Sequence, residues 1–347
     1  MNKNFDDTVV PFNDCFYFSC FYSSLFPVLK YFNKSIFPFM VQGIPKYKQN
    51  DKMGNFGLYT EYVFNENVIE TMKKTGLQFD TWVTSKGVVQ DVIESLIKEK
   101  LVIVSVDCYY LSFRSDFYQK EHWRHFLLIT SYDSRSGCFN VIDQETTDSD
   151  YTWHQLPEKD LEFAYNGFIS KFKDDGEVTL TSIGENGRKI KTNEDFESYA
   201  SQYTTNVKKM ILELLEGNQA INHFMDQYST IMENESELKQ NSEVILNGFN
   251  DIIKVKKTQK YLLDHLFFHH SELTQSIQRT VENWNFVRIV LAKYHYSGVY
   301  KEKSLMKTAK ILREIQLEEN KFLQLLLGVE CEEVIQGFLN KKGEKKC

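Results

Sequence analysis

Cys20 stands directly before an apolar stretch, FYSSLFPVLKYF (21–32), whose hydrophobic residues recur at helical spacing. A thiolate in the first turn of a helix is favoured, because unpaired backbone N–H groups and the helix dipole stabilise negative charge there. Ser19 is a residue type that commonly caps helices, whereas Pro27 is expected to kink this helix. A cysteine nucleophile also needs an imidazole and a group that orients it. The rest of the chain therefore decides whether Cys20 is a nucleophile or a core residue.

The imidazole of His125 is the matching candidate, in preference to that of His122. His125 opens the strand-like run HFLLITSYD (125–133), and Asp143 ends the next such run after the turn SRSG (134–137). Antiparallel pairing across this turn brings residues 125 and 143 to the same end of a hairpin. Asp143 can there accept the second ring N–H of His125 and fix its tautomer. Each of the three also has a structural interpretation, as a core cysteine, a strand histidine and a turn aspartate.

Two regions with different patterns must position these residues. Strand-like runs rich in β-branched and aromatic residues lie at 101–111, 125–133, 138–145, 167–172 and 177–183. Helical spacing marks 20–33, 64–74 and 88–99, and long segments with a period of 3.6 follow from about residue 193. The segment GENGRKIKTNED (184–195) has the composition of a linker. The sequence thus predicts an α+β domain over 1–185 and an all-helical domain over 186–347.

The composition excludes several classes of protein. A chain of 347 residues with 42% hydrophobic and 26% charged residues is typical of a globular protein, and its net charge of −7 argues against general nucleic-acid binding. No stretch has the ~18 unbroken apolar residues of a membrane span, and the first residues lack the apolar core of a secretory signal. Six cysteines without a CxxC pair predict neither zinc nor a disulfide framework, so a cytoplasmic location is expected.

The order of these motifs resembles the papain-like cysteine-peptidase fold, and within it the peptidase C39-like branch. A cysteine at a helix start precedes a histidine that opens an apolar strand, and an aspartate ends the next strand. Positions in the stretch CFYSSLFPVLKYFN that fall at the offsets of that branch's cysteine helix are Leu25, Leu29, Tyr31 and Phe32, with Asn33 in place of the usual glycine. Cys15 gives no such alignment, which favours Cys20.

The stretches VIVSVDCYYLSF (102–113) and EHWRHFLLITSYD (121–133) resemble the family of butirosin-biosynthesis acyltransferases, in which a papain-like N-terminal domain precedes a helical one. The chain also resembles papain-like amide synthetases of polythioamide assembly. The resemblance implies that Cys20 takes an acyl or peptidyl group from the phosphopantetheine arm of a carrier protein. His125 would then accept the proton of an incoming amine, so that an amide forms, without metal or cofactor, in nonribosomal peptide-type biosynthesis.

Further residues are candidates for binding the substrate in the predicted site. Papain-like enzymes commonly place a glutamine six residues before the cysteine, but Asp14 stands here, so Asn13 and the backbone N–H of Cys20 are the candidate oxyanion donors. Asp107, Tyr109 and Tyr110 follow a strand-like run and precede the loop that leads to His125. We therefore expect them near the pocket, with Asp107 available to hold the amine.

Two features of the helical half admit both a structural and a functional interpretation. His265 and His269 have the four-residue spacing of a metal-binding pair, but no third ligand accompanies them, so a structural or surface pair is predicted. Lys303, Lys307 and Lys310 share one helical stripe, which is either a solvated face or a dock for an acidic carrier protein.

Two other functions stay open beside the amide-forming acyltransferase. A cysteine peptidase or amidase with the same three residues would hydrolyse peptides or amides without a carrier protein. A catalytically inactive scaffold would use only the helical half to bind a partner. Selective alkylation of Cys20 near neutral pH separates both enzymes from the scaffold, because an inert core cysteine does not react.

Overall fold

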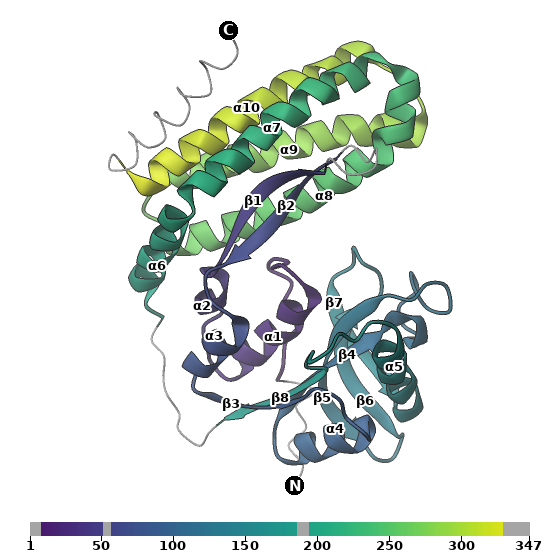
Figure 1. The fold of residues 1–347 in the computed structure, drawn as a ribbon. Helices are drawn as coiled ribbons and strands as arrows, with labels where there is room; N and C mark the ends of the chain where they lie inside the picture. The colour runs from purple at the N-terminus through teal and green to yellow at the C-terminus, as the bar shows by residue number, and fades with distance from the viewer. Residues whose placement is uncertain (1–7, 51–56, 186–193, 329–347) are drawn as a thin grey trace. The chain divides into compact units, whose positions relative to one another are not determined.

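The computed structural model describes residues 8–50, 57–185 and 194–328 (Figure 1). The chain divides into two compact units, Met1–Ile36 with Asn67–Glu194 and Phe37–Glu66 with Asp195–Cys347. We call the first the sheet unit and the second the helical unit. Each has its own hydrophobic core cluster.

The sheet unit is built on a six-stranded antiparallel sheet with the strand order β3-β8-β4-β5-β6-β7. The strands are β3 (Leu77–Trp82), β4 (Leu101–Asp107), β5 (Arg124–Asp133), β6 (Cys138–Gln144), β7 (Tyr151–Pro157) and β8 (Leu180–Glu185). Strand β4 is central and buried along its whole length, which explains its nearly unbroken apolar run of mostly β-branched residues. The predicted hairpin of β5 and β6 is present, with a register shift between Ile129 and Ser131.

Helices of the sheet unit are α1 (Cys20–Tyr31), α3 (Val68–Lys74), α4 (Val88–Ile97) and α5 (Glu158–Lys171), with the short 3₁₀ helix η1 (Cys108–Tyr110) after β4. Helices α4 and α5 share a hydrophobic core with β4 and β5. The strand predicted at 167–172 is wrong, because most of this segment is the end of α5. Leu161, Ala164, Tyr165 and Phe168 are buried at helical spacing, and this pattern outweighs the β-branched and aromatic composition.

The helical unit combines long helices with a β-hairpin from the first part of the chain. Its elements are α2 (Phe37–Met40), β1 (Gly43–Asn50), β2 (Gly57–Phe64), α6 (Phe196–Lys209), α7 (Ile211–Glu233), α8 (Glu235–Leu266), α9 (Ser271–Ser297) and α10 (Glu302–Leu327). Tyr47 and Leu58 of the hairpin belong to the same core as Phe249 and Trp284 of the helices. The hairpin lies close to α8, where a Cβ on Gly248 would stand 2.4 Å from the carbonyl oxygen of Leu58.

The structure therefore differs from the predicted division at residue 185. Residues 37–66 lie inside the predicted α+β domain but pack into the core of the helical unit. A buried polar cluster adds to this attachment: Tyr47 donates to Glu319 (2.5 Å) and accepts from the indole N–H of Trp284 (3.1 Å), and Lys256 pairs with Glu319 (2.7 Å). Most of the predicted linker, at 186–193, lies outside the described residues.

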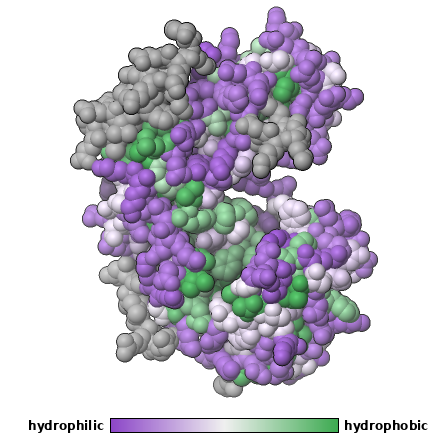
Figure 2. Space-filling view, in the orientation of Figure 1, coloured by the Kyte–Doolittle hydropathy of each residue, from purple (hydrophilic) through white to green (hydrophobic). Residues whose placement is uncertain are grey.

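The visible surface differs between the units in Figure 2. Hydrophilic residues cover most of the helical unit's visible face, and on the sheet unit several hydrophobic patches lie among hydrophilic residues. Across the described ranges 8–50, 57–185 and 194–328, no helix combines the length and apolar character needed to span a membrane.

Candidate active site

The N-terminus of α1 presents Cys20 as its first helical residue. Phe18 adopts a left-handed conformation (φ 56°), which turns the chain just before the helix. Ser19 occupies the predicted N-cap position, although its side chain makes no capping hydrogen bond. The helix continues through the buried Pro27 to Tyr31. Cys20 therefore has the predicted position at a helix start, and its side chain is half-buried.

His125 and Asp143 form a buried pair at the open end of the β5–β6 hairpin. The distance from His125 Nε2 to Asp143 Oδ1 is 2.7 Å, and both side chains are almost fully buried. Asp143 Oδ1 also accepts the backbone N–H of Gln144 (2.8 Å). The contact predicted from the hairpin register is therefore confirmed. Because Asp143 engages Nε2, the nitrogen left to face a partner is Nδ1.

The Cys20 thiol is the partner of His125. Burial disfavours the thiolate, but the positive charge of His125, a hydrogen bond with its ring and the backbone N–H of Phe126 outweigh this, so the pKa of Cys20 is lowered. Burial likewise disfavours the imidazolium, but the negative charges of Asp143 and Cys20 raise the pKa of His125 well above its usual range. Both shifts favour a thiolate–imidazolium ion pair near neutral pH.

Cys108 shows that proximity to His125 alone does not activate a thiol. It is fully buried in η1. Burial raises its pKa to about 11, even though the positive charges of His125 and Arg114 lower the pKa. The sequence analysis did not single out this residue. It provides an internal comparison for Cys20, because His125 is near both thiols but the pKa of Cys20 is lowered and that of Cys108 is raised.

Arg114 is a component of the site that the sequence analysis missed. Its side chain is 2% exposed, and its Nη1 atom lies 3.6 Å from Asp143 Oδ1. Two further nitrogens of the guanidinium bind the carboxylate of Asp116 at 3.0 and 3.1 Å. The guanidinium therefore places a positive charge beside the same carboxylate oxygen of Asp143 that contacts His125 Nε2. The residue comes from an irregular loop, where no periodic pattern marks it.

Asn13, a candidate oxyanion donor, is bound to the backbone of β7. Its amide donates to the carbonyl of Tyr151 (3.0 Å) and accepts the N–H of Tyr151 (2.8 Å). Tyr151 in turn lies near the predicted catalytic residues, because His125, Asp143 and Cys20 all affect its pKa electrostatically. Asp14, which stands where papain-like enzymes commonly have a glutamine, pairs with Lys30 (3.0 Å) at the surface. Asn13 thus holds β7 in place, and its role as an oxyanion donor stays a prediction.

Asp107 forms a second aspartate–histidine pair, with His122. The carboxylate is fully buried, lies 2.6 Å from His122 Nδ1, and accepts the backbone N–H groups of Tyr109 (3.1 Å) and Trp123 (3.2 Å). Both carboxylate oxygens are thus engaged within the loop. This arrangement is at odds with the prediction that Asp107 holds an amine, because such a carboxylate must face the pocket.

The predicted tyrosines surround His122 rather than His125. The ring of Tyr109 stacks on the His122 ring at 4.3 Å, and Tyr110 packs edge-on against Tyr109. Tyr110 also lies against Gly167 of α5, where an added Cβ would stand 2.5 Å from its ring. The structure therefore brings Asp107, Tyr109 and Tyr110 together as one cluster around His122.

The described residues contain no group of three or more metal-binding side chains. Helix α8 ends at Leu266, so His265 is helical and His269 lies beyond the helix end. His265 donates from Nδ1 to the carbonyl of Tyr261 (2.8 Å). The four-residue spacing therefore does not place the two imidazoles one helical turn apart.

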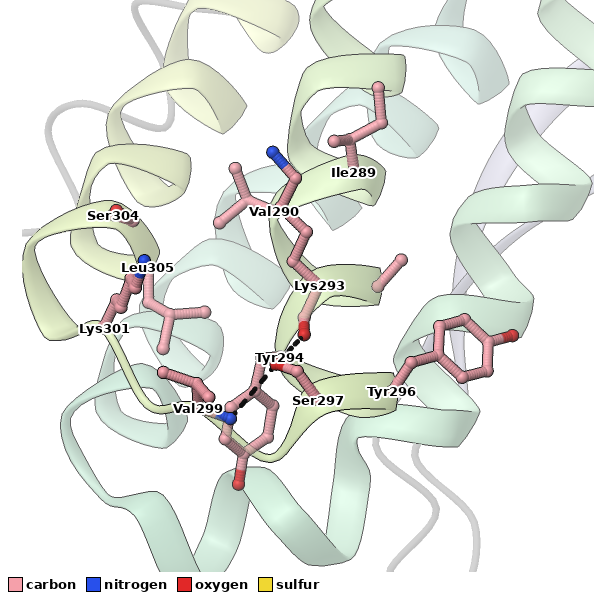
Figure 3. A pocket seen from close by; sticks show the side chains of 11 residues that line it. Ile289, Val290, Lys293, Tyr294, Tyr296, Ser297, Val299, Lys301, Ser304 and Leu305 are labelled. Atoms are coloured by element: carbon pink, nitrogen blue, oxygen red, sulfur yellow. Dashed lines mark hydrogen bonds between the residues drawn. The ribbon is translucent and has the colours of Figure 1, made fainter.

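A surface cavity of about 730 Å³ lies where α9 ends and α10 begins (Figure 3). Lys293 and Lys301 line it together with the exposed Tyr296 and Val299. Lys303, Lys307 and Lys310 follow on α10 and are exposed, as the predicted stripe requires. Residues 283–310 contain six lysines and arginines but one acidic residue, Glu302. This region is therefore basic in a protein whose net charge is −7.

A protein-family model described as butirosin biosynthesis protein H, N-terminal, matches residues 47–144. This match confirms the family resemblance indicated by the stretches at 102–113 and 121–133. It includes His125 and Asp143 but begins after Cys20. A search of curated proteins finds no match.

Proposed function

Because the stretch that carries His125 and Asp143 matches a butirosin-biosynthesis family, we propose that the protein is a biosynthetic acyltransferase with a papain-like catalytic domain. Cys20 is its nucleophile, His125 its general acid and base, and Asp143 the residue that orients His125. The acyl or peptidyl donor is a carrier-protein thioester and the acceptor is an amine, as in nonribosomal peptide-type assembly. The observation that carries this proposal is the lowered pKa of Cys20 beside the Asp143-bound His125.

The first half-reaction exchanges one thioester for another. The Cys20 thiolate attacks the acyl carbonyl carbon, the bond to the carrier thiol breaks, and the His125 imidazolium protonates the departing sulfur. As the first helical residue, Cys20 has a backbone N–H without an intrahelical acceptor, and this group can stabilise the oxyanion. The products are a free carrier thiol, an acyl-Cys20 thioester and a neutral imidazole.

The second half-reaction forms the amide. The amine attacks the acyl-Cys20 carbonyl, and Nδ1 of His125 accepts the amine proton. The carbon–sulfur bond breaks and the thiolate–imidazolium pair is restored. All atoms and charges balance without an oxidant, a nucleotide or a metal. Water competes with the amine, so synthesis depends on a site that excludes water or positions the amine.

The basic region at residues 283–310 supports a carrier protein as the donor. An acidic carrier protein is repelled by a net charge of −7 unless a local positive face offsets this. Lys303, Lys307 and Lys310 are exposed on α10, next to the cavity that Lys293 and Lys301 line. An acidic partner with some apolar surface fits both the lysines and the exposed Tyr296 and Val299.

Intact-protein mass spectrometry after mixing with an acyl N-acetylcysteamine thioester tests the proposal. The wild type and Cys15→Ala should gain the mass of one acyl group, and Cys20→Ala should not. Adding an amine should remove the adduct and release the amide. A protein that never forms the adduct, yet hydrolyses peptides or simple amides through Cys20, is the amidase that the same residues would allow. An adduct on Cys15 would overturn the assignment of the nucleophile.

A further inference from the structure

A cavity of about 710 Å³ opens within the sheet unit, next to the proposed nucleophile. Residues of helices α1 and α3 and of strands β3, β4, β5 and β8 line it, together with the residues that directly precede β8. Phe21, which follows Cys20, and Phe126, which follows His125, both line it. A cavity of this size accommodates a small organic group. Neither the amide-forming chemistry nor the carrier protein accounts for it.

The lining of this cavity is mostly apolar. Three lining residues, Thr81, Thr181 and Ile103, are directly paired across β3, β8 and β4, so they form one row on the same face of the sheet. The apolar lining residues are Phe21, Val68, Ile69, Met72, Leu77, Phe79, Ile103, Phe126, Val178 and Leu180.

The two charged lining residues are already paired with neighbours outside the lining. Lys73 lies 2.7 Å from Glu70, and Glu177 lies 2.6 Å from Arg124. A charged ligand would need to break one of these pairs to gain a partner. The lining therefore suits an apolar group better than a charged or strongly hydrated one.

The cavity wall is continuous with the surroundings of the Cys20 sulfur. The rings of Phe21 and Phe126 meet edge to face with centroids 5.5 Å apart. The backbone of Phe126 also helps to lower the pKa of Cys20, so it lies close to the Cys20 sulfur. A group attached to that sulfur therefore starts beside the wall formed by these two rings.

We infer that this cavity binds the apolar chain of the acyl group while its carbonyl carbon is attached to Cys20. The occupant is an alkyl or aryl acyl chain, not a charged or polyhydroxylated one. This inference rests on the proposed function, because it assumes that Cys20 carries an acyl group. Burial of the chain also keeps water from the neighbouring thioester, which favours the amine over hydrolysis.

The test compares rates of Cys20 acylation with acetyl, hexanoyl and 5-carboxypentanoyl N-acetylcysteamine thioesters, followed by intact mass. For the wild type, the hexanoyl thioester should react about tenfold or more faster than the acetyl thioester, since each buried methylene adds to binding. The 5-carboxypentanoyl thioester has the same chain length with a terminal carboxylate. It should therefore acylate Cys20 no faster than the acetyl thioester does.

A matched pair of tryptophan substitutions locates the effect. Thr81 lines the cavity at an exposed position, so Thr81→Trp narrows the cavity and should bring the hexanoyl-to-acetyl rate ratio down towards one. Thr84→Trp adds the same side chain at an exposed position outside the lining and should keep the wild-type ratio. Equal wild-type rates for all three thioesters would overturn the inference and leave the acyltransferase proposal intact. Failure of every thioester to acylate Cys20 would instead overturn the proposed function.

Discussion

At the scale of residues, charge alternates along the proposed site. The Cys20 thiolate, the His125 imidazolium, the Asp143 carboxylate and the Arg114 guanidinium follow one another, so each negative charge has a positive neighbour. Such pairing is required here, because an isolated charge in a buried environment is strongly disfavoured. Cys108 lacks this arrangement and keeps a raised pKa of about 11.

Asp143→Asn tests the orienting role at this scale. The amide can still contact His125, but it no longer supplies the negative charge that raises the pKa of His125. We expect acylation of Cys20 to slow by about 10²–10⁴ while the thioester still binds. Single-turnover acylation followed by intact mass measures the rate. As a control, Asp226→Asn removes the same charge from an exposed position on α7 and should not affect the acylation rate. Normal turnover in Asp143→Asn would exclude Asp143 from the site.

At the scale of elements, the sequence best predicted those contacts that depend on the pattern of neighbouring residues. The contact of His125 with Asp143 follows from alternation and from a short turn, both of which are written in adjacent residues. Arg114 could not be found this way, because its role depends on the path of a loop in three dimensions. The end of α5 was mistaken for a strand, since aromatic and β-branched residues occur in buried helices as well.

The β1–β2 hairpin was the largest element that the pattern did not reveal. Its strands carry two lysines and a glutamate among the apolar residues. Their burial depends on helices far along the chain, as in the contact of Lys46 with Glu213, which lies 167 residues later. Glycines in α7 and α8 mark the places where these helices contact the hairpin. Gly217 and Gly248 lie against the backbone of Tyr47 and Leu58, where a side chain would not fit.

Gly248→Ala tests this packing. Alanine favours a helix over glycine by about 1 kcal/mol, but its Cβ would stand 2.4 Å from the carbonyl oxygen of Leu58. We expect a net loss of stability of roughly 1–3 kcal/mol, as for other overpacked sites. Urea unfolding followed by circular dichroism measures it. Asn247→Ala, at the exposed neighbouring position, should be neutral or stabilising; equal stabilisation of both variants would contradict the close approach of the hairpin.

At the scale of the whole molecule, charge is unevenly distributed. The chain is acidic overall, yet residues 283–310 carry six basic residues and one acid. The sequence analysis identified the lysine stripe on α10, and the structure adds the neighbouring cavity with Lys293 and Lys301. That the stripe binds a carrier protein stays a prediction.

Reversing Lys303, Lys307 and Lys310 to glutamate should weaken the reaction with a carrier-bound acyl group. The reaction with a free N-acetylcysteamine thioester should hardly change, because the variant leaves the predicted catalytic residues intact. The wild-type carrier reaction should also slow as salt rises, since exposed charges are screened within about 8–10 Å. A control variant reverses Lys98, Lys159 and Lys171, which are exposed in the sheet unit. Equal effects of both triple variants would indicate that net charge, not the α10 stripe, governs the reaction.

The pH dependence of cysteine alkylation tests the central claim, the activated Cys20 thiolate, most directly. The measurement is the iodoacetamide rate at each cysteine, read by peptide mapping from pH 5 to 9. Because the pKa of Cys20 is lowered, its thiolate persists below the ordinary thiol pKa of about 8.5 and is lost only as pH falls through the lowered value. Cys20 should therefore react faster below pH 8.5 than an ordinary thiol does, and Cys108 hardly at all, and His125→Ala should remove this excess reactivity of Cys20. A Cys20 rate that falls about tenfold per pH unit below pH 8.5, or faster labelling of Cys15, would contradict the account.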